Sequence, residues 1–200
     1  MISTNIIQYR REQDVTMSLW NNWLYRRLLF FMAPHNWSLG VLDFCAGRDK
    51  PRQLGIGAMS CYILFGEGKH EQGTTDFTPF EASSILKLDP DQFHTFACDK
   101  PARLLVVASE TPLDFNLSVQ RLGPGRSISG EAASYYILHG CVDVRVGCNN
   151  QKLESTTAFF IMPQIEYTVE NIGNSDALII GINAGVAVKR GINGASFAQK

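Results

Sequence analysis

The most constraining feature of this 200-residue chain is an internal repeat. Three segments recur later in the chain in the same order, and the offset between the copies stays between 73 and 75 residues. The copies are residues 62–66 (YILFG) and 136–140 (YILHG), residues 90–94 (PDQFH) and 163–167 (PQIEY), and residues 102–108 (ARLLVVA) and 177–183 (ALIIGIN). Because the offset is nearly constant across separate segments, the chain is expected to contain one structural unit twice.

Each copy has the pattern of a series of β-strands. An apolar strand closed by glycine is followed by a polar hairpin, a second apolar strand, a turn with proline and a last apolar strand. This order resembles the cupin barrel, a small antiparallel jelly roll. We therefore predict an all-β fold of duplicated cupin (RmlC-like) antiparallel jelly-roll barrels in one chain, with little helix, since no long segment has a 3.6-residue apolar period. The expected domains are residues 1–113 and 114–200, closely packed as a bicupin.

Apolar runs between turn residues predict the individual strands. Residues 6–16 are expected to form an edge strand or a short helix, residues 47–57 a loop, and residues 184–200 a loose tail. The expected strands are residues 23–32, 37–45, 61–65, 83–88, 93–97 and 103–109 in the first unit, and residues 115–122, 135–138, 142–146, 158–162, 167–170 and 178–182 in the second.

Composition excludes several classes of function. The formal net charge is −1 and the basic residues are scattered, which argues against nucleic-acid binding. No apolar run approaches the ~20 residues that span a bilayer, and the start of the chain lacks the pattern of a signal peptide, so we expect a cytoplasmic protein. The five cysteines are an odd number without metal-ligand spacing, and we expect free thiols packed as small apolar side chains.

The resemblance to cupins implies where a metal would be held. Cupin enzymes generally bind a divalent ion through an HxH pair and a carboxylate before the closing glycine, plus a histidine after the proline turn. Counted back from Gly66, those first positions fall at residues 53–59, which contain no His, Asp or Glu; counted back from Gly140, Glu131 is the only acid nearby. The last position is His94 in the first unit and Tyr167 in the second.

These departures predict a cupin without a metal or other cofactor. His94 remains a weak metal candidate, and we expect it to be a hydrogen-bonding group or a relic. His70 falls in the polar hairpin and is expected to be exposed, and no feature of the sequence places the histidines together.

Further segments resemble the HutD/Ves family of bicupins. Residues 17–23 (MSLWNNW), residues 62–68 (YILFGEG) and residues 114–116 (DFN), with an arginine shortly after, follow the order of that family's motifs. The family's arginine before its Leu-x-Gly strand corresponds to about Ser60, so the anion anchor that this arginine would provide is missing. The resemblance implies a pocket for a histidine-degradation metabolite, with Trp20, Asn21, Asn116 and the motif arginine Arg121 as candidate ligand-binding residues. His94, at the last position of the cupin metal set, is a further candidate.

Three functions remain open from the sequence. The favoured one is a non-enzymatic or weakly enzymatic bicupin that binds a small polar metabolite in a regulatory or housekeeping role, which the HutD/Ves resemblance would place in amino-acid (histidine) catabolism. The second is a metal-dependent dioxygenase or isomerase that combines His94 with loop carboxylates such as Glu71, Asp76 or Glu81. The third is a β scaffold that forms a homodimer without a ligand.

Overall fold

The computed structural model of the chain describes residues 7–20, 23–31, 36–53, 57–73, 77–130, 134–162 and 165–186, with the backbone alone at Trp20, Arg52 and Val186. Throughout these residues the chain is built from β-strands, and its one helical element is a single 3₁₀ turn, η1 (Glu12–Asp14). The predicted all-β class is therefore confirmed. No helix in the described part of the chain has the length and apolar character needed to cross a membrane.

The first barrel is formed by two antiparallel sheets. The larger sheet has the order β10-β7-β12-β4-β3-β2, and the smaller has the order β5-β11-β8-β9, with β6 also paired to β11. The strands of the larger sheet are β2 (Ser18–Trp20), β3 (Trp23–Phe31), β4 (Trp37–Phe44), β7 (Ala58–Phe65), β10 (Ile85–Leu88) and β12 (Ala102–Ser109). Those of the smaller sheet are β5 (Gly47–Arg48), β6 (Arg52–Gln53), β8 (Glu67–Gln72), β9 (Thr78–Glu81) and β11 (Phe93–Cys98).

The second barrel repeats this plan. Its larger sheet has the order β1-β18-β15-β20-β13, and its smaller sheet has the order β14-β19-β16-β17. The strands of the larger sheet are β1 (Ile7–Arg11), β13 (Leu113–Leu122), β15 (Ser134–His139), β18 (Thr157–Ile161) and β20 (Ala177–Val186). Those of the smaller sheet are β14 (Ser127–Gly130), β16 (Cys141–Val146), β17 (Asn149–Glu154) and β19 (Tyr167–Asn171).

The sequence repeat corresponds to a repeat of backbone geometry. Gly66 and Gly140 end equivalent strands with φ of +93° and +97°, and each lies against an alanine of the neighbouring strand. A Cβ at Gly66 would lie 2.7 Å from the Ala102 Cα, and one at Gly140 would lie 2.8 Å from the Ala177 Cα. Only glycine fits such a position, which explains why this residue closes the strand in both copies.

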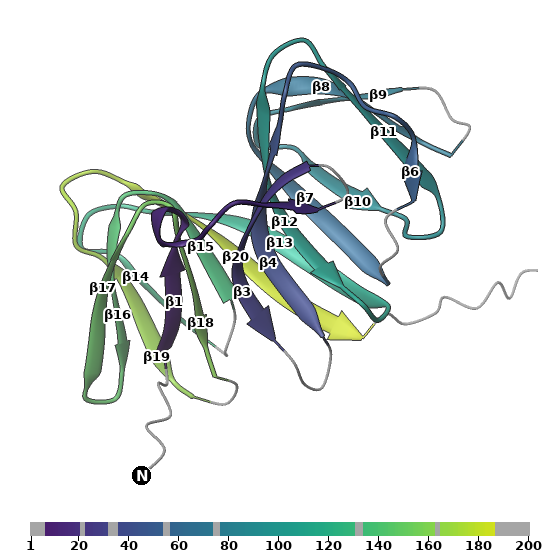
Figure 1. Cartoon of the computed structure of the whole chain (residues 1–200). Coiled ribbons are helices and arrows are strands. Elements are labelled where there is room, and N and C mark those ends of the chain that lie inside the picture. Colours follow the sequence, from purple (N-terminus) through teal and green to yellow (C-terminus); the bar gives the residue numbers. More distant parts are fainter. Residues whose placement is uncertain are drawn as a thin grey trace, which may run out of the picture.

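Three apolar cores organise the part of the chain that the structure describes. One fills the first barrel around Trp23, Phe44 and Phe96, and another fills the second barrel around Phe159 and Val169. The third core joins the outer faces of the two larger sheets. Figure 1 shows this arrangement, with the two smaller sheets at opposite ends of the molecule and the larger sheets between them.

The N-terminal segment links both barrels. Strand β1 pairs with β18 of the second barrel, η1 follows, and β2 pairs with β3 of the first barrel. The described part of the predicted segment, residues 7–16, thus supplies both an edge strand and a short helical turn. The loop expected at residues 47–57 is partly wrong, because β5 and β6 form short pairings with β11.

Candidate functional site

Two histidines meet inside the first barrel. His70 on β8 is 6% exposed and His94 on β11 is fully buried, and His70 Nε2 lies 3.0 Å from His94 Nδ1. The prediction that His70 is exposed and apart from His94 is therefore wrong. Its hairpin continues as a barrel strand, and the alternation of that strand turns His70 inward beside Phe96.

The hydrogen bonds define the proton positions of this pair. His94 Nε2 lies 2.7 Å from the carbonyl oxygen of Asp89, which can only accept, so Nε2 carries the proton. In neutral His94, Nδ1 must then accept the hydrogen bond that His70 Nε2–H donates. Burial, with the charge of His94 as a second cause, lowers the pKa of His70 to about 4. Burial also lowers the pKa of His94, against the opposing effect of the Asp89 carbonyl.

These residues do not fit the metal set that the cupin fold implies. Both ring nitrogens of His94 are engaged, and nowhere among the described residues do three or more His, Cys, Asp or Glu side chains come together as metal ligands. Glu71 pairs instead with Arg48, at 3.3 Å. At the place equivalent to His94, Tyr167 of the second barrel hydrogen-bonds the hydroxyl of Tyr135.

Of the predicted ligand-binding residues, the structure describes the side chains of His94, Asn116 and Arg121, and it does not bring these three together. Asn116 is exposed on β13, where it pairs with Asn183 of β20. Arg121 is also exposed on β13 and forms an ion pair of 2.5 Å with Asp176. His94, by contrast, lies in the interior of the first barrel. Asn21 and the side chain of Trp20 lie outside the described residues.

A groove of about 580 Å³ lies on the smaller sheet of the first barrel. Its volume is within the range of roughly 300–1,000 Å³ typical of small-molecule sites. Polar and charged side chains line it together with the apolar surfaces of Pro79, Phe80 and Ala97. The other lining residues are Glu67, Gly68, Lys69, Glu81, Ser84 and Asp99.

The second barrel shows why this groove is open. In the first barrel, the row across β9, β8 and β11 is Pro79, Lys69 and Ala97. In the second barrel, the equivalent row across β17, β16 and β19 is Lys152, Asp143 and Glu170. There, Arg145 covers the row by contacting Asp143 at 2.7 Å and Glu170 at 2.8 Å. In the first barrel, Pro79 and Ala97 stand at the places of Lys152 and Glu170, so two of the three charged side chains of this row are replaced by small apolar ones.

The charges of the groove have no partners within the described chain. None of the ion pairs between described residues involves Glu67, Glu81, Asp99 or Lys69. Glu67 and Glu81 are directly opposite each other on β8 and β9, and like charges in such a pair destabilise a sheet. Three carboxylates against one ammonium give the groove a negative potential.

The sequence reasoning missed these groove residues. A signal was present in the repeat, because aligning the two copies places Lys69 and Ala97 opposite charged residues of the second unit. This signal can be interpreted only when β8 is known to pair with β9, and the sequence did not predict β9 as a strand.

Comparison with known proteins supports the fold and leaves the family open. No protein-family model matches the chain, and no curated protein matches it either. Among solved structures it is similar to a conserved protein of unknown function from Pseudomonas aeruginosa, with a TM-score of 0.75 and 11% identity over 90% of this chain and 98% of that one. An oxalate decarboxylase from Lactobacillus farciminis, solved as a formate complex, gives a TM-score of 0.73 and 10% identity over 90% of this chain and 86% of that one.

A cupin 2 conserved barrel domain protein from Leptotrichia buccalis is also similar, with a TM-score of 0.62 and 10% identity over 91% of this chain and 98% of that one. These likenesses, together with the two barrels described above, define the chain as a protein of the cupin fold with a bicupin arrangement. The duplicated cupin predicted from the repeat is confirmed, whereas the narrower resemblance to HutD/Ves proteins stays a prediction.

Proposed function

We propose that this chain is a cytoplasmic, non-enzymatic bicupin that binds a small polar metabolite in the groove on the smaller sheet of its first barrel. The observation that carries this proposal is the groove itself, whose charged side chains form no ion pair with any described residue. The HutD/Ves resemblance makes metabolites of histidine degradation the first compounds to test, with a regulatory role for the bound state.

The lining of the groove defines the chemistry of the ligand. Glu67, Glu81 and Asp99 would accept hydrogen bonds from a protonated nitrogen, and Lys69 would donate to a carboxylate. Pro79 and Ala97 offer apolar surface to the rest of the ligand. A zwitterionic compound with an additional cationic nitrogen, such as a basic amino acid, satisfies these groups together.

The test is a binding measurement with a matched pair of variants. Histidine and its degradation products are screened by thermal shift, since a ligand that prefers the folded state raises the melting temperature. For a ligand found in this way, we expect the double substitution Glu67→Gln and Glu81→Gln to weaken the affinity by about tenfold in calorimetry, because two charge-assisted contacts are lost.

The control lies in the second barrel. Glu154 is opposite Cys141 in the same way that Glu81 is opposite Glu67, and it is exposed. Glu154→Gln therefore makes the same chemical change at the equivalent place and should leave the affinity unaltered. A ligand that binds the double variant as tightly as the wild type would place the site elsewhere and contradict the proposal.

A further inference from the structure

The N-terminal strap, residues 7–20, is attached to the barrels through a carboxylate. Among residues 7–19, whose side chains are described, Glu12 is the one that is buried; it is 8% exposed. Ile7 and Val15 are half-buried, while the rest of this stretch is exposed. Strap residues that insert fully into a fold are normally apolar, because burying a carboxylate is costly unless it is paired. The position of Glu12 therefore needs a specific socket.

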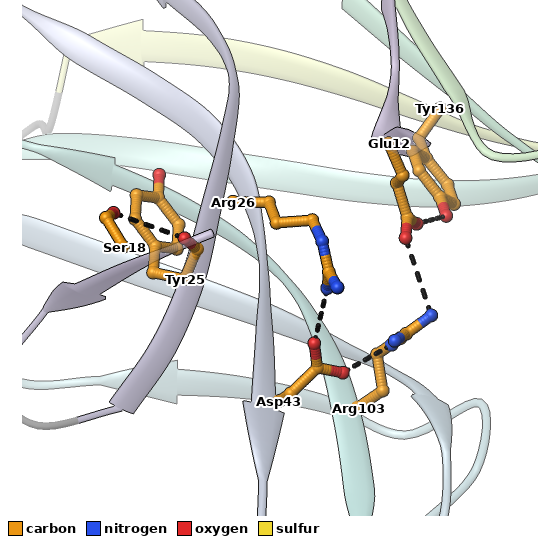
Figure 2. Close-up of polar contacts among 7 residues, drawn as sticks. All are labelled: Glu12, Ser18, Tyr25, Arg26, Asp43, Arg103 and Tyr136. Carbon is orange, nitrogen blue, oxygen red and sulfur yellow. Dashed lines mark hydrogen bonds and ion pairs between the residues drawn. The ribbon is translucent and has the colours of Figure 1, made fainter. Parts of the chain in front are cut away.

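The socket lies at the junction of the two barrels. Glu12 Oε1 accepts a hydrogen bond from the Tyr136 hydroxyl on β15, and Glu12 Oε2 lies 3.4 Å from Arg103 Nη1 on β12. Arg103 Nε in turn contacts Asp43 Oδ1 at 2.5 Å, and Arg26 Nη1 contacts the other oxygen of Asp43 at 2.5 Å. Figure 2 shows these side chains converging from the strap and from both larger sheets.

The socket is built to hold an anion. The two guanidinium groups are balanced by Asp43 and Glu12, so removing the Glu12 carboxylate leaves one excess positive charge in a partly buried place. Burial and the neighbouring Glu12 raise the pKa of Tyr136, so its hydroxyl stays protonated and can donate. Burial acts to lower the pKa of Arg103, but Asp43 and Glu12 outweigh it and raise that pKa.

The ion pair between Glu12 and Arg103 is the longest of the three ion pairs, whereas the hydrogen bond from Tyr136 to Glu12 is short. The distance of 3.4 Å from Glu12 to Arg103 exceeds the roughly 2.7–2.9 Å of a strong charge-assisted hydrogen bond, while both contacts of Asp43 are shorter than that range. The backbone of the strap is held by edge pairings, β1 on β18 and three residues of β2 on β3, and by a hydrogen bond of 2.9 Å from the Glu12 N–H to the Thr156 carbonyl oxygen. Edge segments with few buried contacts open locally at low free energy.

We propose that Arg103 and Tyr136 form a binding site for a small organic carboxylate, which Glu12 occupies as a built-in ligand until an external carboxylate displaces it and releases the strap. This site is distinct from the groove of the first barrel and does not depend on it. Like Glu12, the external ligand would present a carboxylate to the guanidinium of Arg103 and the hydroxyl of Tyr136. Because its binding would release the strap, hydrogen–deuterium exchange of residues 7–20 would report whether the site is occupied.

The test uses acetate as the probe and chloride at equal ionic strength as the reference. In the full-length wild type, saturating acetate should raise the hydrogen–deuterium exchange of residues 7–20, and chloride should not. In Glu12→Ala the socket is vacant, so acetate should bind at least about tenfold more tightly than in the wild type and raise the melting temperature saturably. Asp14→Ala, in the same 3₁₀ turn but exposed, should behave like the wild type.

Two results would overturn the proposal. One is a folded Glu12→Ala protein whose melting temperature responds to acetate no more than to chloride. The other is a wild-type strap whose exchange is insensitive to acetate. Should Glu12→Ala fail to fold, Glu12→Gln keeps an acceptor for Tyr136 without the charge, and its strap should be displaced at lower acetate concentration than that of the wild type. If the strap of Glu12→Gln is displaced only at the acetate concentration that the wild type requires, the proposal is contradicted.

Discussion

At the scale of single residues, the buried histidine pair makes stability depend on pH. The pKa of His70 in the folded protein is about 4, below its unfolded value of 6.5, so the unfolded chain binds a proton first. The stability conferred by neutral His70 is therefore complete above pH 6.5 and is lost as the pH falls toward 4. A loss of at most about 3 kcal/mol is expected from this shift. Urea unfolding at several pH values between 4 and 8 measures it.

The control for this prediction is another histidine of the same chain. His70→Gln should flatten the dependence between pH 6.5 and 4, whereas His139→Gln should not, because His139 is exposed. Acid-sensitive carboxylates contribute equally to all three proteins, so the difference between the curves isolates the contribution of the His70–His94 pair. Identical slopes for the wild type and His70→Gln would show that the pair titrates normally.

The pair also shows how far residue-level prediction reaches. His94 stands out because it follows the proline turn at a repeated position, and the weak metal role suggested for it rested on that place alone. The sequence could not show that His70 is the partner of His94, since the register between β8 and β11 decides which side chains meet. A shift of one residue in β8 would turn His70 to the outer face.

At the scale of elements, the strand-closing glycines predict a graded cost of substitution. Gly140→Ala adds a Cβ 2.8 Å from the Ala177 Cα at a positive φ, whereas Gly147→Ala meets no atom within 4 Å although its φ of +56° is also positive. The strained backbone alone costs about 1–2 kcal/mol, so Gly147→Ala should lose about that much. Gly140→Ala should lose clearly more, because the neighbouring strand must move. Chemical denaturation of both variants measures the difference, and equal losses would contradict the role of the close approach.

The same elements show what the sequence could predict. Long apolar strands such as β7, β12 and β20 were predicted, because their apolar runs are bounded by glycine, proline or polar turns. The two-residue strands β5 and β6 were missed, since pairings so short depend on β11 lying beside them and not on their own residues. The pairing of β1 with β18 could not be predicted either, because the two strands are separated by most of the chain.

At the scale of the whole molecule, the apolar core between the barrels decides whether they unfold together. Phe115 on β13 is 1% exposed in that core and lies 5.9 Å from the ring of Trp37 on β4, so it contacts the other barrel directly. Phe115→Ala should cost about 3–5 kcal/mol, the usual loss for a buried phenylalanine. Phe93→Ala is the matched control, because Phe93 is 55% exposed and its removal should cost less than about 0.5 kcal/mol.

Hydrogen–deuterium exchange in urea can follow the two barrels separately, through peptides that cover β7 to β12 and β15 to β20. If the shared core couples the barrels, both sets of peptides become exchangeable at the same urea concentration, and Phe115→Ala lowers that concentration equally for both. Independent domains of residues 1–113 and 114–200 would instead give two transitions, with the variant affecting each to a different extent. The coupled outcome follows from the structure, since the outer faces of β4, β7 and β12 are left without cover when the second barrel unfolds.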